Sequence, residues 1–387
     1  MNIAKLTKKL KFKELIVPAE NAIEAAIVEN IIITPVKNLN ELMAHLEKRN
    51  EITPQSQTKF TDSNIIHNIE IGEIKGQPTA KRALTIAAAG GHNMVMIGSP
   101  GAGKTMLAQS INSILPPMNL EESIEATQIY SAANMLGEKS FINIRPFRSP
   151  HHTASPVAII GGGSHPKPGE VSLAHRGVLF LDELPEFRRD LLETLRQPLE
   201  AHKVHISRAR SSIIFPAKFM LVAAMNPCPC GYHRDPEKEC KCSANEILKY
   251  QKKVSGPLLD RIDLQINVPR VKVEELSVKN EAAAKETLTM RAQVILAREI
   301  QTKRFADAKL KIFTNSEMSS KQCDSIADVE TAGIKFLENY SKKNYLSARG
   351  YYRTIKVGRT IADLSNSSSV TEGHLAEAVS YRIREEE

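Results

Sequence analysis

Residues 98–105 have the composition of a phosphate-binding loop and fit the pattern G-x-x-x-x-G-K-[ST] at every fixed position. An apolar run precedes them and a helical pattern follows, which is the context that this pattern requires. Glycines let backbone amides curve around a phosphate, and a helix N-terminus adds positive potential. We therefore expect a site for MgATP, with Lys104 on the β- and γ-phosphates and the Thr105 hydroxyl on Mg²⁺. The eight residues of the loop are Gly98, Ser99, Pro100, Gly101, Ala102, Gly103, Lys104 and Thr105.

Two adjacent carboxylates, Asp182 and Glu183, follow the apolar run 177–181. In open α/β sheets, ligands bind at the carboxyl ends of the strands. The pair therefore predicts Asp182 in the Mg²⁺ shell and Glu183 as the group that activates the attacking water. The alternative is an acidic pair that caps a helix.

Four cysteines are crowded together with the spacing C-x-C-x₉-C-x-C. Four thiolates can hold a structural Zn²⁺ tetrahedrally, and these four are Cys228, Cys230, Cys240 and Cys242. The C-x-C spacing is tighter than the usual C-x₂-C, so ordinary reduced cysteines are an equal alternative. No histidine or carboxylate signature accompanies the cluster, which disfavours a catalytic zinc.

The elements that must position these residues alternate between strand and helix. Apolar runs at 93–97, 178–181 and 219–224 indicate buried strands, and residues 79–88 and those following 104 have helical spacing. This alternation is typical of an α/β fold, a parallel sheet with helices on both faces. After about residue 273 the pattern is nearly all helical, which predicts an α-helical lid domain. The lid segments are 274–300, 316–327, 329–340, 348–365 and 371–384.

We expect four parts along the chain. Residues 1–50 indicate a short βαβα piece that is too small to bury a good core alone. Residues 51–68 are polar and indicate a linker. The α/β core spans 69–272, and the lid spans 273–387.

Composition excludes several classes of protein. The 387 residues are 42% hydrophobic and 25% charged, which is ordinary for a globular chain. No apolar stretch approaches the length of a spanning helix, so no membrane partner is expected. Five cysteines in a chain of this length suggest a reducing compartment, hence a cytoplasmic location. The formal net charge of +8 permits an anionic partner such as nucleic acid.

Further motifs resemble the AAA+ ATPases. Asn226, after the third strand, is similar to the sensor 1 residue that holds the lytic water. Residues 255–263 resemble the arginine-finger segment, which implies that Arg261 reaches the nucleotide of a neighbouring subunit. Residues 346–350 resemble the sensor 2 helix, with Arg349 as the sensing residue. A shared active site implies a homo-oligomeric ring, which we expect to be a hexamer.

Longer strings narrow the resemblance to the ComM/YifB family of magnesium-chelatase-like ATPases, over nearly the whole chain. These strings are residues 147–155, 161–163, 168–170, 226–231 and 359–364. The family is implicated in DNA branch migration during recombination and natural transformation. The family usually begins with a Lon-protease-like domain, and residues 12–46 resemble only its last part.

Two segments could contact DNA. Residues 159–169 are crowded with Gly and Pro and resemble the helix-2 insert, which includes Lys167. Residues 203–216 alternate like a hairpin and resemble the pre-sensor 1 hairpin. Its basic residues Lys203, Arg208 and Arg210 suit phosphate contacts, and a solvated basic surface is the alternative. The adjacent His151 and His152 lack an evident third metal ligand and are expected to belong to the packing or the polar surface of the insert.

The sequence thus favours a ComM-type MgATPase, a ring-forming DNA motor acting in branch migration. Two other readings stay open. One is a chelatase-type motor subunit for metal insertion, and the other is a shortened remnant that binds nucleotide without activity.

Overall fold

The computed structural model places the chain in two compact units. Unit 1 comprises Met1–Ile65 and Pro117–Arg145, and unit 2 comprises Ile66–Pro116 and Pro146–Glu387. The described residues are 2–58, 69–137, 141–163, 166–208, 211–271 and 282–382.

A parallel sheet forms the centre of unit 2. Among the described residues it has five strands in the order β11-β3-β10-β7-β4, and every pairing is parallel. The α/β fold class is therefore confirmed, and the three expected strands appear within one residue of their expected bounds. The strands are β3 (Met94–Ile97), β4 (Phe147–Arg148), β7 (Val178–Leu181), β10 (Met220–Met225) and β11 (Leu264–Asn267).

Both faces of this sheet are buried. Successive residues of a strand point to opposite faces, and here they enter two different hydrophobic clusters. Met96 and Phe180 belong to a cluster that includes residues of the helices α4, α5, α14 and α17. Val95 and Leu179 belong to a second cluster, which includes residues of α8, α9 and α10. The continuous apolar runs of the sequence are therefore explained by burial on two sides.

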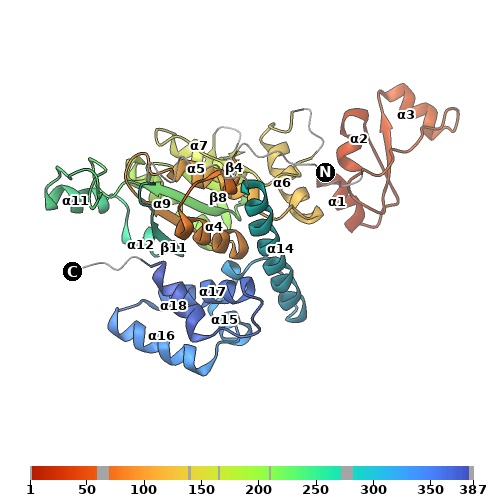
Figure 1. The fold of residues 1–387 in the computed structure, drawn as a ribbon. Coiled ribbons are helices and arrows are strands. Elements are labelled where there is room, and N and C mark those ends of the chain that lie inside the picture. Colours follow the sequence, from red (N-terminus) through yellow and green to blue (C-terminus); the bar gives the residue numbers. More distant parts are fainter. Residues whose placement is uncertain are drawn as a thin grey trace. The chain divides into compact units, whose positions relative to one another are not determined.

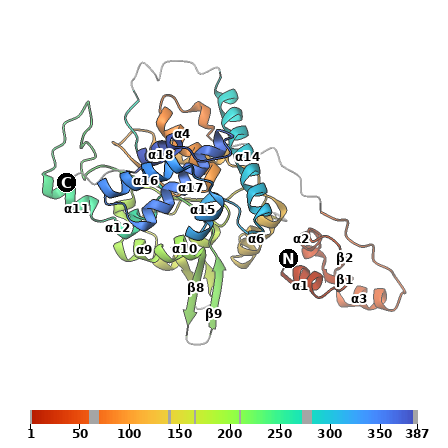
Figure 2. The ribbon, with the colours of Figure 1, turned by 90° about the horizontal axis from the view of Figure 1, so that it is seen from below.

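Helices and two short hairpins surround the sheet. The hairpin expected at 203–216 is confirmed as β8 and β9, paired antiparallel (Figure 2). The described elements around the sheet are α4 (Pro78–Gly90), α5 (Lys104–Ile114), α7 (Pro156–Ile160), β5 (Gly161–Gly162), β6 (Lys167–Pro168), α8 (Glu170–Leu173), α9 (Arg189–Thr194), α10 (Arg196–Ala201), β8 (Lys203–Arg208), β9 (Ser211–Pro216), α11 (Ala244–Gln251) and α12 (Gly256–Leu259), with the 3₁₀ turns η1 (Ile71–Glu73) and η2 (Leu184–Glu186).

The C-terminal region is helical, as the spacing predicted. Helices α15 to α18 gather into one body that begins after the long helix α14 (Figure 1). Leu337 and Leu375 of this body share one buried hydrophobic core with Phe305, which lies near the end of α14. None of the helices among the described residues is long and apolar enough to cross a membrane. The helical elements are α14 (Ala283–Asp307), η3 (Asn315–Glu317), α15 (Ser320–Ile326), α16 (Thr331–Lys343), α17 (Ala348–Leu364) and α18 (Glu372–Ser380).

One buried carboxylate joins the sheet to the helical region. Asp263 is 6% exposed and precedes β11. Its Oδ2 accepts a hydrogen bond from the Asn93 amide at 3.1 Å and lies 3.3 Å from His92 Nδ1. Its Oδ1 accepts from Arg353 Nη1 of α17 at 2.6 Å. Burial opposes ionisation, but Arg353 and His92 hold the pKa of this carboxyl well below its ordinary value.

Unit 1 contains a two-stranded parallel sheet, in which Leu15 pairs with Ile33. Helix α1 precedes the expected βαβα piece and was not predicted. Residues 51–58 have no regular element, yet the Gln55 amide donates to Ile33 O at 2.7 Å. The elements of unit 1 are α1 (Asn2–Lys9), β1 (Glu14–Pro18), α2 (Ala19–Ala25), β2 (Ile32–Val36), α3 (Leu39–Leu46) and α6 (Leu120–Ala132).

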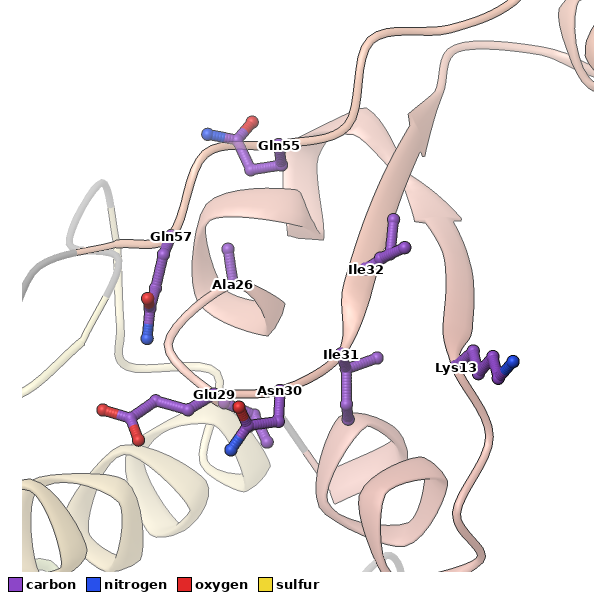
Figure 3. A pocket seen from close by; sticks show the side chains of 9 residues that line it. Lys13, Ala26, Glu29, Asn30, Ile31, Ile32, Gln55 and Gln57 are labelled. Atoms are coloured by element: carbon purple, nitrogen blue, oxygen red, sulfur yellow. The ribbon is translucent and has the colours of Figure 1, made fainter.

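A shallow hollow in unit 1 lies between the end of α2, the start of β2 and residues 55–57 (Figure 3). Lys13 and Glu29 belong to its lining, and Figure 3 shows these two side chains at opposite ends. The hollow therefore does not place Lys13 and Glu29 side by side, as acid–base chemistry between them would require.

The Asp263 contacts generate a stability prediction. Asp263→Asn should lower the free energy of unfolding by about 3–5 kcal/mol, because it removes the buried counter-charge of the partly buried Arg353. The loss, measured by urea denaturation at pH 7, should shrink as the pH falls below about 4. A carboxyl with a depressed folded pKa stabilises the fold above its unfolded pKa and loses this effect on acidification.

Asp190→Asn is the matched control, because Asp190 is exposed and pairs with the exposed Arg188. The control should leave stability nearly unchanged. Equal stability of the two variants would contradict the role of Asp263.

Candidate active site

The loop 98–105 connects β3 to α5 and has an open face. Gly101 and Gly103 have φ angles of +81° and +86°, and a Cβ at either position would meet no atom within 4 Å. Glycine is needed there for the backbone angle rather than for space. At Gly98 the reason is different, because a Cβ would lie 2.2 Å from the Val268 carbonyl oxygen. The loop thus leaves open space beside Gly101 and Gly103 at the start of a helix, which suits an anion.

Lys104 is buried, and its ammonium points into the loop. Its Nζ donates to the carbonyl oxygens of Gly98 at 2.6 Å and Ser99 at 3.0 Å, and to Asn226 Oδ1 at 3.1 Å. Burial lowers the pKa of Lys104, while the nearby Asp182 and Glu183 carboxylates oppose this shift. The Lys104 ammonium therefore contacts three other expected site residues, Gly98, Ser99 and Asn226.

Asn226 reaches the Lys104 ammonium because β10, the strand that precedes Asn226, lies beside β3, the strand that precedes the loop. β10 pairs with β3 in parallel, with Met225 opposite Ile97, so Asn226 begins the chain that leaves the same sheet edge. The Gly98 amide also donates to Met225 O at 3.2 Å.

Thr105 and Asp182 form an oxygen pair that fits a magnesium ion. The Thr105 hydroxyl donates to Asp182 Oδ2 at 2.7 Å, and Asp182 Oδ1 accepts from the Glu183 amide at 2.9 Å. Mg²⁺ in nucleotide sites is held by one or two protein oxygens together with phosphates and waters. A hydroxyl and a carboxylate at hydrogen-bond distance satisfy this requirement without rearrangement of the backbone.

Glu183 is held in an unusual conformation directly after β7. Its φ is +52°, in the left-handed region that residues other than glycine rarely occupy. The side chain is 56% exposed, and its Oε2 lies 3.5 Å from His152 Nδ1. Such strain is common where a side chain must be aimed at a ligand. His152, which we expected in the packing or polar surface of the insert, lies beside the expected catalytic carboxylate.

Arg261 and Arg349 form a second group. Arg261 is 3% exposed, and it donates to Glu200 Oε1 at 2.6 Å and to Pro257 O at 2.5 Å. Arg349 is exposed, and its Nη2 lies 3.2 Å from the same Glu200 oxygen. Among the described contacts, none joins these arginines to the loop 98–105. The structure thus brings the expected arginine finger and the expected sensor 2 arginine together on one carboxylate of α10.

The four clustered cysteines face one another. Cys228 Sγ lies 3.4 Å from Cys230 Sγ and 3.7 Å from Cys240 Sγ, and the latter two are 3.6 Å apart. All four sulfurs, including that of Cys242, lie within 4.8 Å of one another. A tetrahedron with zinc–sulfur bonds of about 2.3 Å has sulfurs about 3.8 Å apart, whereas a disulfide needs about 2.05 Å. The cluster therefore has the size of a zinc–tetrathiolate site.

Backbone amides support the thiolate form of this cluster. The His233 amide donates to Cys228 Sγ at 3.3 Å, and the Cys230 amide donates to Cys242 Sγ at 3.4 Å. A hydrogen bond from the Tyr232 backbone is the largest cause that lowers the pKa of Cys230 to about 6, whereas desolvation and the neighbouring cysteines raise the pKa of Cys240 and Cys242. The donor set is suitable for Zn²⁺, which binds deprotonated thiols.

The candidate DNA contacts are only partly described. Lys167 in β6 and Lys203 in β8 are exposed. Arg208 ends β8, and its side chain lies outside what the structure describes, as does the whole of Arg210. Figure 2 shows β8 and β9 projecting from the rest of unit 2.

Comparison with known proteins gives consistent matches. Residues 70–276 match the family model of magnesium chelatase, subunit ChlI, and residues 284–382 match the model of the C-terminal part of this subunit. The competence protein ComM of Haemophilus influenzae is 43% identical over 380 residues, which are 96% of this chain and 72% of ComM. The uncharacterized protein YifB of Escherichia coli K12 is 40% identical over 381 residues, 98% of this chain and 73% of YifB. A magnesium-chelatase 67 kDa subunit of Heliobacterium mobile is 25% identical over 191 residues, 42% of this chain and 28% of that subunit.

The shared carboxylate of the two arginines leads to a prediction. Glu200→Gln should lower the free energy of unfolding by about 1–3 kcal/mol, because the buried Arg261 loses a charged hydrogen-bond partner. Urea denaturation measures the change. Glu186→Gln is the control, since Glu186 is exposed to the same degree, 43%, and pairs with an exposed lysine. A Glu200 variant no less stable than the control would show that Arg261 does not depend on this carboxylate.

Proposed function

The chain belongs to the magnesium chelatase ChlI-like family of AAA+ ATPases, in the group of YifB and ComM, and we propose that it hydrolyses ATP at the loop 98–105. The observation that carries the proposal is the convergence of Lys104, Asn226 and the Thr105–Asp182 pair at one edge of the sheet. Phosphate, metal and water ligands are thereby available from three neighbouring strands.

Each residue has a distinct part in the proposed reaction. The loop amides and Lys104 bind the phosphates, and Thr105 and Asp182 hold the metal. Mg²⁺, when bound, neutralises charge on the β- and γ-phosphates. Glu183 orients a water and accepts its proton, and Asn226 holds that water in line. Because Glu183 is more than half exposed, water reaches it directly.

We further propose that Arg261 acts on the nucleotide of a neighbouring subunit in a homo-oligomeric ring, expected to be a hexamer, with Arg349 as the sensing residue. Both arginines lie on the carboxylate of Glu200, which supports a joint role of the two side chains. An arginine that reaches a neighbour's nucleotide stabilises the charge that develops on the transferred phosphoryl group.

We propose that this ATPase couples hydrolysis to movement along DNA, in branch migration during recombination or natural transformation. The projecting hairpin β8–β9, with the exposed Lys203, and the exposed Lys167 of the insert support contacts to phosphates. The relative from H. influenzae is named a competence protein. A chelatase-type motor subunit for metal insertion is the second candidate, supported by the similarity to the H. mobile subunit.

ATP turnover with and without four-way-junction DNA tests this proposal. We expect turnover that junction DNA stimulates, and we expect Glu183→Gln to reduce it by at least about 100-fold while nucleotide still binds. Lys104→Ala should lose nucleotide binding. Turnover that ignores DNA would favour the chelatase-type motor. A chain that binds nucleotide without turnover would contradict the ATPase proposal.

The four-cysteine cluster is proposed as a structural zinc site, so purified chain should contain about one zinc per chain. The double variant Cys240→Ser, Cys242→Ser should lose the metal, and acidification should release it because the thiolates take up protons. Cys323→Ala is the control, because Cys323 is buried in the helical region away from the cluster. Folded wild-type chain free of zinc would refute the site.

A further inference from the structure

The segment between the paired cysteines approaches the phosphate-binding loop very closely. Gly231 has a φ of +86°, and a Cβ on it would lie 2.6 Å from both Cγ and Cδ of Pro100. Side chains do not tolerate such a distance, so any other residue would force the two segments apart. The backbone of Gly231 therefore packs directly against the side chain of Pro100 at this point.

Asp235 is connected to the same part of the loop through an ion pair with Arg270. Its side chain has no solvent exposure, and its Oδ2 lies 3.2 Å from Arg270 Nε. The nearby Ser99 side chain is the largest cause that lowers the pKa of Asp235. Arg270 Nη2 in turn donates to Pro100 O at 3.1 Å. One buried carboxylate and one guanidinium thus hold Pro100 of the phosphate-binding loop.

The position of Asp235 is set within its own segment. Asp235 Oδ1 accepts from the amides of Glu237 at 2.9 Å and Lys238 at 3.0 Å, and its amide donates to Tyr232 O at 3.1 Å. Arg270 also lies over the Tyr232 ring, 5.5 Å from its centroid. The four sulfurs join the two ends of this segment, with Asp235 between them.

We propose that residues 228–242 form a metal-closed brace that positions the phosphate-binding loop, with Asp235 as the positioning residue. The proposal rests on nucleotide binding at that loop, as proposed above. Metal in the cluster fixes the ends of the brace, and this order reaches Pro100 from Gly231 directly and from Asp235 through Arg270. Nucleotide affinity consequently depends on residues that do not touch the nucleotide.

Equilibrium binding of a fluorescent ATP analogue with Mg²⁺ tests the brace on the full chain. Asp235→Asn is isosteric and should weaken binding about tenfold, as expected for the loss of one charge-assisted hydrogen bond. It should keep its zinc and its secondary structure, so that a lower affinity cannot come from loss of the segment itself. The double variant Cys240→Ser, Cys242→Ser should lose zinc and bind at least as weakly.

Two further variants sharpen the outcome. Arg270→Lys combined with Asp235→Asn should bind no more weakly than Asp235→Asn alone, since both interrupt the same connection to Pro100. Asp190→Asn, on the exposed surface, should bind as the wild type does. Unchanged affinity of the Asp235 variant would overturn the brace, while the proposed nucleotide site would stand if Lys104→Ala still abolished binding. Wild-type chain that binds no nucleotide would overturn both proposals.

Discussion

The parallel register of three neighbouring strands is the constraint on which the candidate site depends. β3, β10 and β7 are adjacent in the sheet, and each ends at the same edge. Each of these strands is followed by one residue of the site: Lys104, Asn226 or Asp182. The parallel pairing of the strands therefore places a cation, an amide and a carboxylate close together. Burial on both faces fixes the register, because a slip by one residue would exchange the side chains of two separate cores.

Much of this arrangement could be predicted from local sequence. The loop 98–105 has a pattern that backbone geometry requires, and the continuous apolar strands identify a doubly covered sheet. Glu200, His152 and Asp235 could not be found in this way. Each is an ordinary polar residue whose partner lies far along the chain, 61 residues away for Glu200 and Arg261. Such partners become neighbours only after the strands have paired, and no local pattern records this.

The cysteine cluster is a second feature that the sequence alone does not determine. Its spacing left a zinc site and ordinary reduced cysteines open, because C-x-C does not by itself set the distance between sulfurs. The structure supplies that distance, 3.4–3.7 Å between three pairs of sulfurs. It also supplies a reason for the glycine that follows Cys230, since Gly231 lies against Pro100 of the phosphate-binding loop.

Glu200 gives the two arginines a structural connection to the basic hairpin. It lies on α10, and the next residue but one, His202, has a left-handed φ of +55° where the helix turns into β8. The Ala217 amide donates to His202 O at 2.9 Å and closes the base of the hairpin. An interaction that draws Arg261 or Arg349 away from Glu200 therefore removes a charge partner from the last turn before the hairpin. In a ring motor of the proposed kind, this short segment is where a neighbour's nucleotide and a bound polyanion would act on the same helix.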